Sequence, residues 1–129
     1  MTKVYTVEVT DNGDTFWYNN KGDLHREEGP AVEYSNGTKE WWLNDKLHRI
    51  GGPAIEYSGG SKEWWLHGKR HRTDGPAIES ADGSKYWCLN GQYYTCEALW
   101  KEAVDALNQS SCNGKIVEIE GKRYKLIEV

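Results

Sequence analysis

Apolar and polar residues alternate along the chain in short runs that end at glycine turns. Residues 54–58 read "AIEYS" and residues 61–66 read "SKEWWL", with Gly59-Gly60 between them. Alternation places successive side chains on opposite faces of a strand, so this pattern predicts a β-hairpin. The same turn in the neighbouring copies is Asn36-Gly37 or Asp82-Gly83, and a second turn follows the aromatic run at Asn44-Asp45, His67-Gly68 and Asn90-Gly91. We expect the Asn-Gly, Asp-Gly and Gly-Gly pairs to form turns in which both central residues have positive φ.

The hairpin pattern repeats with a step of 23 residues. His25, His48 and His71 are evenly spaced, because 48 − 25 and 71 − 48 both equal 23. The same step relates three Gly-Pro-Ala segments and two apolar rows, which are Tyr18, Trp41, Trp64 and Trp87, and Leu43, Leu66 and Leu89. A fixed period of this length indicates an array of units that stack on their neighbours. We expect the phase to hold without insertion.

The two ends of the chain depart from this period. Residues 3–9 and 15–19 predict an irregular first hairpin that turns at Asn12-Gly13. Residues 95–111 place Leu99, Val104 and Leu107 close to helical spacing, with Thr95 as N-cap and Asn113-Gly114 as the stop signal. Residues 115–129 predict a last hairpin. The chain is therefore expected to be mainly β (α+β), with a hairpin array at residues 1–94 and a helix-and-hairpin cap at residues 95–129.

Composition and charge restrict the classes of function. The formal net charge is −4, and acidic and basic residues are interspersed. A general nucleic-acid binder carries a basic patch instead, so we expect no binding of that kind. We expect no export signal, because residues 2–10 lack a basic start and an apolar core, and we expect no membrane-spanning segment. The chain's three cysteines, Cys88, Cys96 and Cys112, lack metal-ligand spacing, which favours a reducing compartment. We expect a cytoplasmic protein that does not bind membranes.

The repeated residues resemble those of the MORN repeat family. The pattern "LHR..GPA.EY..G.KEWW.NGK" is most similar to MORN-like repeats of bacteriophage and large-DNA-virus proteins, over residues 16–93. The chain departs from the family's Tyr-x-Gly-x-Trp core through its Trp-Trp, His-Arg and Gly-Pro elements. The resemblance implies an open, twisted antiparallel sheet of MORN-like β-hairpin repeats, and it implies no chemistry.

The recurring histidines raise the hypothesis of a metal site. Equivalent residues of consecutive hairpins lie two strands apart, roughly 10 Å at about 4.8 Å per strand, whereas zinc ligands sit about 2 Å from the ion. His25, His48 and His71 therefore cannot share one ion, and His67 has no nearby cysteine to complete a set. We expect each repeated histidine to hydrogen-bond the backbone of the adjacent repeat. We expect no metal and no cofactor.

Arg26, Arg49 and Arg72 form a second row at the same spacing. Guanidinium groups grip carboxylates or phosphates, so this row is a candidate site for an anionic ligand or an acidic partner. Internal pairing is favoured, because a feature copied in every repeat usually serves stacking. The candidate internal acids are Glu27, Glu28 and Asp74, and the repeated Glu33, Glu56 and Glu79. Arg49 is followed by Ile50 and Gly51 where the other copies have acids, so we expect Arg49 to be the arginine that is free for a ligand.

The tryptophans divide between two faces. Trp41, Trp64 and Trp87 are regular enough to predict core packing between hairpins. Trp42 and Trp65 lie on the other face, together with Glu40, Glu63 and Asn44, which predicts partial exposure. Two uses of this second row stay open. It stacks on a base, a sugar or a protein partner, or it is covered by the C-terminal helix or a second subunit.

Catalysis has little support in the residues. A catalytic cysteine such as Cys96 needs a partner base and an oxyanion donor, and the histidines and carboxylates are all repeated. We therefore expect a non-enzymatic binding protein. The predicted partner contacts are Trp42, Trp65, Arg26, Arg49 and Arg72.

The nature of the partner follows from the resemblance alone. A phage-encoded protein of this kind implies a host protein as partner, and inhibition of a host defence system or host enzyme by protein–protein interaction in the host cytoplasm. Two other functions stay open. One is the sequestration of a small nucleotide or signalling ligand, and the other is a structural or assembly module that oligomerises through sheet edges.

Overall fold

The computed structural model describes residues 5–112, and the side chains of residues 5–108. The chain divides into two compact units, Met1–Tyr93 and Tyr94–Val129. The hairpin predicted at residues 115–129 and the stop signal Asn113-Gly114 lie outside the described residues.

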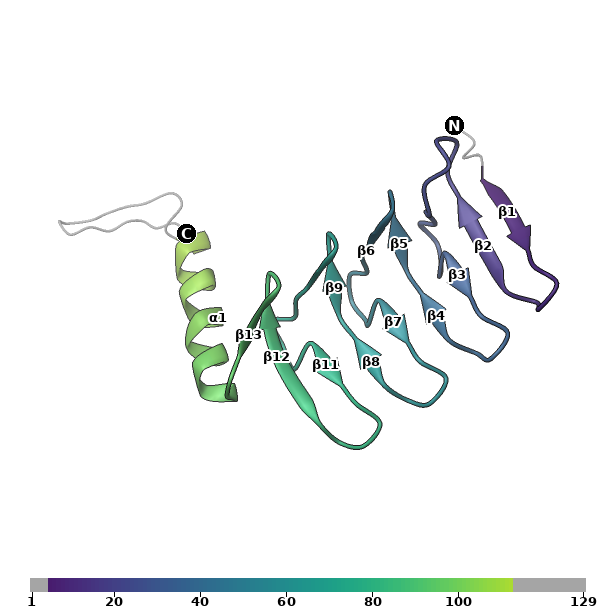
Figure 1. The fold of residues 1–129 in the computed structure, drawn as a ribbon. Helices are drawn as coiled ribbons and strands as arrows, with labels where there is room; N and C mark the ends of the chain where they lie inside the picture. The colour runs from purple at the N-terminus through teal and green to yellow at the C-terminus, as the bar shows by residue number, and fades with distance from the viewer. Residues whose placement is uncertain (1–4, 113–129) are drawn as a thin grey trace. The chain divides into compact units, whose positions relative to one another are not determined.

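The described part of the chain is mostly antiparallel strand with one helix, so the mainly β class is confirmed. The main sheet has the order β1-β2-β3-β4-β7-β8-β11-β12-β13, and β5–β6 and β9–β10 form separate two-stranded ribbons. Figure 1 shows the sheet strands side by side in chain order, with the ribbons beyond the ends of the strands that lead into them. The strands are β1 (Thr6–Val9), β2 (Thr15–Tyr18), β3 (Val32–Glu33), β4 (Lys39–Glu40), β5 (Trp42–Leu43), β6 (Lys46–Leu47), β7 (Ile55–Glu56), β8 (Lys62–Glu63), β9 (Trp65–Leu66), β10 (Lys69–Arg70), β11 (Ile78–Glu79), β12 (Lys85–Leu89) and β13 (Gln92–Tyr94).

The second unit contains the helix α1 (Glu97–Cys112). Cys96, and not the expected Thr95, precedes its first residue. Trp100 and Val104 are its buried residues among those with described side chains, whereas Leu99 and Leu107 are exposed. The apolar spacing therefore predicted the helix correctly, but of its two buried residues it predicted only Val104. No described helix is long and apolar enough to cross a membrane.

Each full copy of the repeat contains two hairpins, and not the single hairpin that we predicted. The run at residues 61–66 divides into β8 and β9, with Trp64 between them. The Trp64 N–H donates to the Ala77 carbonyl at 2.8 Å, and the Trp64 carbonyl accepts from the His71 N–H at 3.1 Å. The chain changes its hydrogen-bonding partner at this tryptophan, leaving the main sheet to form the β9–β10 ribbon.

The two hairpins of a copy use different turns. In the short turns both central residues have positive φ, as expected for a type I′ turn: Asn44 and Asp45 have φ of 49° and 68°, and His67 and Gly68 have 51° and 81°. In the longer turns only the glycine has positive φ, and the Gly37 N–H donates to the Tyr34 carbonyl at 2.9 Å. These are type I turns that end in a glycine bulge, so the prediction of two positive φ angles is wrong for them.

The first copy is out of phase by one residue. The Trp17 N–H donates to the Ala31 carbonyl, as Trp41 does to Ala54 and Trp64 does to Ala77, each at 2.8 Å. Trp17, and not Tyr18, is thus the equivalent of the later tryptophans. The cause is an extra residue in the turn of the "NNKGD" segment, where Gly22 has φ of 87° and its N–H donates to the Asn19 carbonyl. The expectation of no insertion is wrong here.

The Gly-Pro-Ala alanines join consecutive hairpins at the centre of the sheet. The Ala54 carbonyl accepts from Trp41, and the Ala54 N–H donates to the Glu63 carbonyl at 2.7 Å. Ala31, Ala54 and Ala77 have no exposed surface. A larger side chain at these three positions would meet neighbouring atoms and not solvent.

A second joint between hairpins lies at the longer turns. The side-chain oxygen atoms of Asp14, Thr38 and Ser61 accept hydrogen bonds from backbone N–H groups of the following hairpin. Their donors are Ser35, Ser58 and Ala81, at 2.8, 3.1 and 2.9 Å. Each of these bonds connects a copy to the next copy only.

Candidate functional site

The repeated arginines lie flat on tryptophan rings. The guanidinium carbons of Arg26, Arg49 and Arg72 are 3.8, 3.8 and 3.7 Å from the ring centroids of Trp17, Trp41 and Trp64. Cation–π stacking of this kind is worth about 0.5–2 kcal/mol, depending on desolvation. The three pairs define one side of the array, the arginine face. Trp41 and Trp64, for which we predicted core packing between hairpins, are half-buried and covered by guanidinium groups, as is Trp17.

Each of these arginines also contacts acceptors within its own copy. Arg49 Nη1 donates to the Pro53 carbonyl at 3.0 Å and to the Glu56 carboxylate at 2.9 Å. The expectation that Arg49 is free of internal acids is therefore wrong, because its acid is seven residues further on and not adjacent. The prediction of internal pairing is confirmed for all three arginines, through Glu33, Glu56 and Glu79.

The adjacent acids behave differently in the other two copies. Arg72 Nε also donates to Asp74 at 2.8 Å, as the sequence predicts. In the first copy Glu27 contacts His25 at 3.0 Å, and the carboxylate paired with Arg26 belongs to Glu33. Since every guanidinium already has a carboxylate partner, the arginine face offers an anionic ligand little uncompensated charge.

The glycine of each Gly-Pro pair makes room for the arginine. A Cβ atom placed on Gly29, Gly52 or Gly75 would lie 3.2, 3.0 or 2.8 Å from the guanidinium carbon of the preceding arginine. The guanidinium therefore occupies a slot between an indole ring and a bare glycine. The Arg, Gly and Pro of the repeated motif thus serve one packing arrangement.

The repeated histidines hold the turn of the following copy. Their Nδ1 atoms accept hydrogen bonds from the backbone N–H groups of Asn44, His67 and Asn90, each in the left-handed conformation, at 3.0, 2.9 and 2.9 Å. The predicted bond to the adjacent repeat is confirmed for all three. Burial lowers the pKa of His48 and His71, and the neighbouring His67 lowers that of His48 further.

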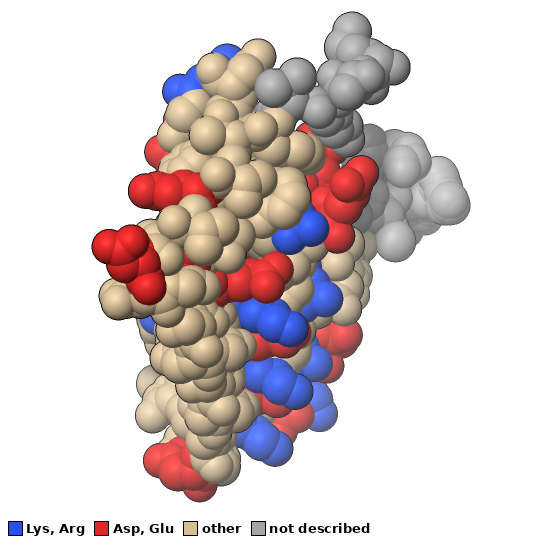
Figure 2. Space-filling model, turned by 90° about the vertical axis from the view of Figure 1, so that its right-hand side faces the viewer, with Lys and Arg blue, Asp and Glu red and all other residues tan. Residues whose placement is uncertain are grey.

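Two grooves follow the connections between copies on the arginine face. The first, of about 600 Å³, includes Arg26, Pro30, Trp41 and Arg49, and the second, of about 420 Å³, includes Arg49, Trp64 and Arg72. Ile50 lines both grooves and is 82% exposed. Figure 2 shows acidic and basic side chains intermingled on the side that it displays, without a large patch of one sign.

The opposite side of the sheet carries several of the described tyrosines. Tyr57 follows Ile55 by two residues, and Tyr86 lies opposite Ile78, so their side chains share the face of these isoleucines. The indole N–H groups of Trp42 and Trp65 donate to Glu40 and Glu63 on this face at 2.8 and 2.9 Å. We define the aromatic face as Trp42, Tyr57, Trp65, Tyr86 and Tyr93.

Glu63 connects several residues of the aromatic face. Its carboxylate accepts hydrogen bonds from Tyr57 at 3.2 Å, from Trp65 at 2.9 Å and from Arg70 at 3.3 Å. Arg70 in turn donates to the Tyr93 hydroxyl at 2.7 Å and lies 4.7 Å from the Trp65 ring centroid. Burial raises the pKa of Tyr57, and the charge of Glu63 adds to that increase.

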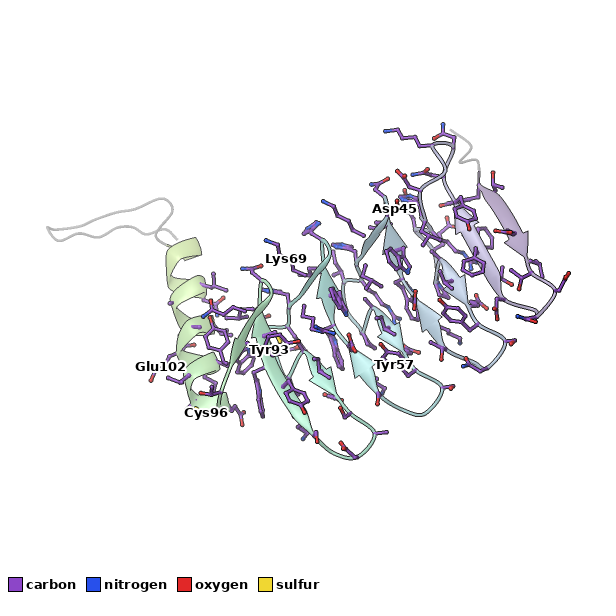
Figure 3. The ribbon with its side chains drawn as sticks, viewed as in Figure 1. Asp45, Tyr57, Lys69, Tyr93, Cys96 and Glu102 are labelled. Atoms are coloured by element: carbon purple, nitrogen blue, oxygen red, sulfur yellow. The ribbon has the colours of Figure 1, made fainter. Side chains whose placement is uncertain are left out.

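The residues predicted from the sequence do not include Arg70 and Tyr93. They continue a 23-residue row that begins with Leu24 and Leu47, so the change from leucine to arginine and tyrosine is visible in the repeat itself. Figure 3 labels Tyr57 and Tyr93 on this part of the array.

The five predicted contact residues divide between the two faces. Arg26, Arg49 and Arg72 lie on the arginine face. Trp42 and Trp65 lie on the aromatic face, half-buried as predicted, and both line a groove of about 340 Å³ with Lys46 and Lys69. Figure 3 places Lys69 at the tip of the β9–β10 ribbon and Asp45 at the tip of β5–β6.

Within residues 5–112, no group of three or more His, Cys, Asp and Glu side chains is arranged to hold a metal ion. Comparison of the chain with protein-family models, with curated proteins and with solved structures finds no match.

Proposed function

We propose that this chain is a non-enzymatic binding protein that contacts a protein partner through its aromatic face. The observation that carries the proposal is the exposure of Tyr57, Tyr86 and Tyr93, 40–51% each, on the face that also holds Trp65 and Arg70. Tyrosine, tryptophan and arginine are the residues enriched at the energetic centres of protein interfaces.

The Glu63 network supports the proposal because it orders the side chains before a partner arrives. Tyr57, Trp65 and Arg70 each donate to this carboxylate, and Arg70 fixes the Tyr93 hydroxyl. Ordering a flexible side chain on binding costs about 0.5–1.5 kcal/mol, and a side chain already held in place avoids most of that cost. Aromatic rings then supply a large contact area with little loss of conformational entropy.

The arginine face is the weaker candidate for the same role. Its guanidinium groups are stacked on indole rings and paired with Glu33, Glu56 and Glu79. Engaging them with an acidic partner would break contacts that already exist. The same reasoning weighs against the nucleotide-sequestering alternative, which needs charge that is not already compensated.

The class of partner rests on the resemblance of the repeats. The "LHR..GPA" pattern resembles MORN-like repeats of bacteriophage and large-DNA-virus proteins, and this supports a host protein as partner. We propose that binding inhibits a host defence factor or host enzyme by covering part of its surface, without a chemical reaction.

The proposal is tested with an identified partner and matched variants. The immobilised full chain captures proteins from a lysate of the presumed host, and the captured protein is purified and titrated calorimetrically. We expect Tyr57→Ala and Tyr93→Ala each to weaken binding at least about tenfold, which corresponds to the loss of one interface contact of about 1.4 kcal/mol.

The control variants lie on the other face. Lys39→Ala and Lys62→Ala change exposed side chains there, and we expect each to bind the partner as the parent does. Binding that survives both tyrosine changes and fails in the lysine variants would place the contact on the arginine face. A nucleotide released from the denatured protein would instead support the small-ligand alternative.

A further inference from the structure

Strand β1 forms one edge of the nine-stranded sheet. All four of its residues are exposed, and Val7 and Val9 are 46% and 66% exposed. β1 pairs with β2 alone, in the register Thr6 with Tyr18, Val7 with Trp17, Glu8 with Phe16 and Val9 with Thr15. The other side of β1 has no neighbouring strand among residues 5–112.

The backbone groups of Val7 and Val9 point to this open side. The Trp17 N–H donates to Ala31, and the Trp17 carbonyl accepts from His25, so neither Trp17 group points toward β1. Val7, opposite Trp17, is therefore in a non-hydrogen-bonded pair, and its N–H and C=O groups point away from β2. Because the hydrogen-bonding direction alternates along an antiparallel strand, the backbone groups of Val9 point the same way. The Thr10 N–H donates to the Asp14 carbonyl at 2.9 Å. This direction agrees with an alternation in which residues 6, 8 and 10 bond toward β2 and residues 5, 7 and 9 face the open side.

The open edge lacks the usual devices that prevent strand addition. Sheet edges are commonly blocked by proline, by lysine or by a bulge. β1 reads Thr-Val-Glu-Val, and its one charged group, Glu8, already accepts a hydrogen bond from the Tyr18 hydroxyl at 3.2 Å. An edge of this kind presents free N–H and C=O groups next to exposed β-branched side chains.

We propose that β1 pairs antiparallel with β1 of a second copy of this chain, on a two-fold axis at Val7. Val7 then lies opposite Val7, Thr6 opposite Glu8, and Tyr5 opposite Val9. The outward-facing residues 5, 7 and 9 supply the hydrogen bonds from each copy. The contact is isologous, so it closes at a dimer and joins two nine-stranded sheets.

The charge of β1 favours this register over the neighbouring one that is centred on Glu8. Centring the pair on Glu8 would also match outward-facing residues, Val7 with Val9, but would place two carboxylates opposite each other. Centring it on Val7 places each Glu8 next to a neutral threonine. Of these two registers, the one centred on Val7 keeps the two carboxylates apart.

The side chains give the paired strands an apolar strip. Tyr5, Val7 and Val9 share the face of Trp17, and the Tyr5 ring packs against the Trp17 ring with centroids 5.4 Å apart. Pairing brings two copies of each valine and of Tyr5 together on that face. Cross-strand aromatic and β-branched pairs of this kind stabilise antiparallel sheets. The contact leaves the aromatic face uncovered, so it is independent of the proposed function.

Sedimentation and one edge-specific substitution test the dimer. The full chain is expected to sediment as a concentration-dependent dimer. Val7→Pro removes an N–H that points away from β2, so the β1–β2 ladder is kept while strand addition is blocked. We expect Val7→Pro to raise the dimer dissociation constant at least about a hundredfold, since two symmetric hydrogen bonds are lost. The matched control Val7→Thr keeps the N–H and a β-branched side chain, and should remain dimeric.

Amide hydrogen exchange of the unchanged chain gives an independent measurement. In the dimer the N–H groups of Val7 and Val9 are expected to exchange as slowly as those of Thr6 and Glu8. Exchange at Val7 and Val9 that stays as fast as in an open loop would overturn the proposal. So would a monomer at all concentrations, or a dimer that Val7→Pro leaves intact.

Discussion

The imidazole Nδ1 of His48 accepts a hydrogen bond from the backbone N–H of His67 at 2.9 Å, and the two rings lie 4.5 Å apart. The bond joins one copy of the repeat to the turn of the next. It requires a neutral imidazole, because a protonated Nδ1 is a donor and cannot accept. Stability of the array is thereby linked to histidine protonation.

The free energy of unfolding should fall as the solution is acidified through the histidine range. The pKa values of His48 and His71 are lower in the folded chain than the ordinary value of 6.5. The unfolded chain therefore binds more protons as pH falls below that value, and stability decreases until the folded pKa values are passed. Urea unfolding at about pH 7.5 and about pH 5.5 measures the change.

His67→Asn provides the matched control for this pH dependence. Asparagine occupies the equivalent positions 44 and 90 and tolerates the left-handed conformation. The substitution removes the neighbouring ring that lowers the pKa of His48, so that pKa should rise and the pH dependence should become shallower. An unchanged or steeper dependence would contradict the assigned cause.

Gly75→Ala should destabilise the fold by about 1–2 kcal/mol, because the new methyl group displaces Arg72 from Trp64. Gly52→Ala and Gly29→Ala should follow in that order, since the added Cβ lies progressively further from the guanidinium carbon. Thermal unfolding of the three variants gives the ranking. Gly59→Ala is the control, because its Cβ meets nothing within 4 Å. A loss of stability in Gly59→Ala as large as that in Gly75→Ala would show that the loss does not come from displacing the guanidinium group.

Gly59→Asn should stabilise the protein by about 0.5–1 kcal/mol. Asn36 and Asp82 occupy the same turn position and accept hydrogen bonds from the N–H groups of Thr38 and Ser84, each at 2.9 Å. Gly59 lacks that acceptor and does not need positive φ. Gly60→Asn, at a φ of 105°, should instead be destabilising, and denaturant midpoints of the two variants distinguish the cases.

Trp87, the last tryptophan of the row, should contribute less to the stability of the fold than Trp64. Trp87 has no stacked arginine among the described residues, and its buried indole N–H has no hydrogen-bond partner there. Trp64 carries Arg72 at 3.7 Å. We expect Trp64→Phe to lower the free energy of unfolding by about 1–2 kcal/mol more than Trp87→Phe. Equal losses in calorimetry would show that the stacked arginine contributes nothing measurable.

The periodic residues made much of the architecture predictable. Each repeated turn, strand entry and histidine bond is copied in register, so one correct interpretation applies to every copy. One error arose where a contact joins residues that are not adjacent in the sequence. Glu56 is one of the candidate acids in the sequence, but only the fold shows that this residue, seven positions after Arg49, is the partner of that arginine.

The division of each copy into two hairpins was also hidden in the sequence. "SKEWWL" alternates well enough for one strand, and only the hydrogen bonds of Trp64 show the change of partner within it. The phase shift at Trp17 was masked because Tyr18 is also aromatic and lies at the exact period. Arg70 and Tyr93 were visible as departures from Leu24 and Leu47, but their meeting depends on the side-chain conformations around Glu63.

The joints between hairpins make array length an adjustable property. The histidine bonds span 19 residues, and those accepted by Thr38 and Ser61 span 20, so each reaches the next copy and none passes over it. Duplicating or deleting one 23-residue copy recreates the same joints at the new boundary. Recombination between copies therefore gives evolution, or a protein engineer, longer and shorter versions of this surface without a new fold.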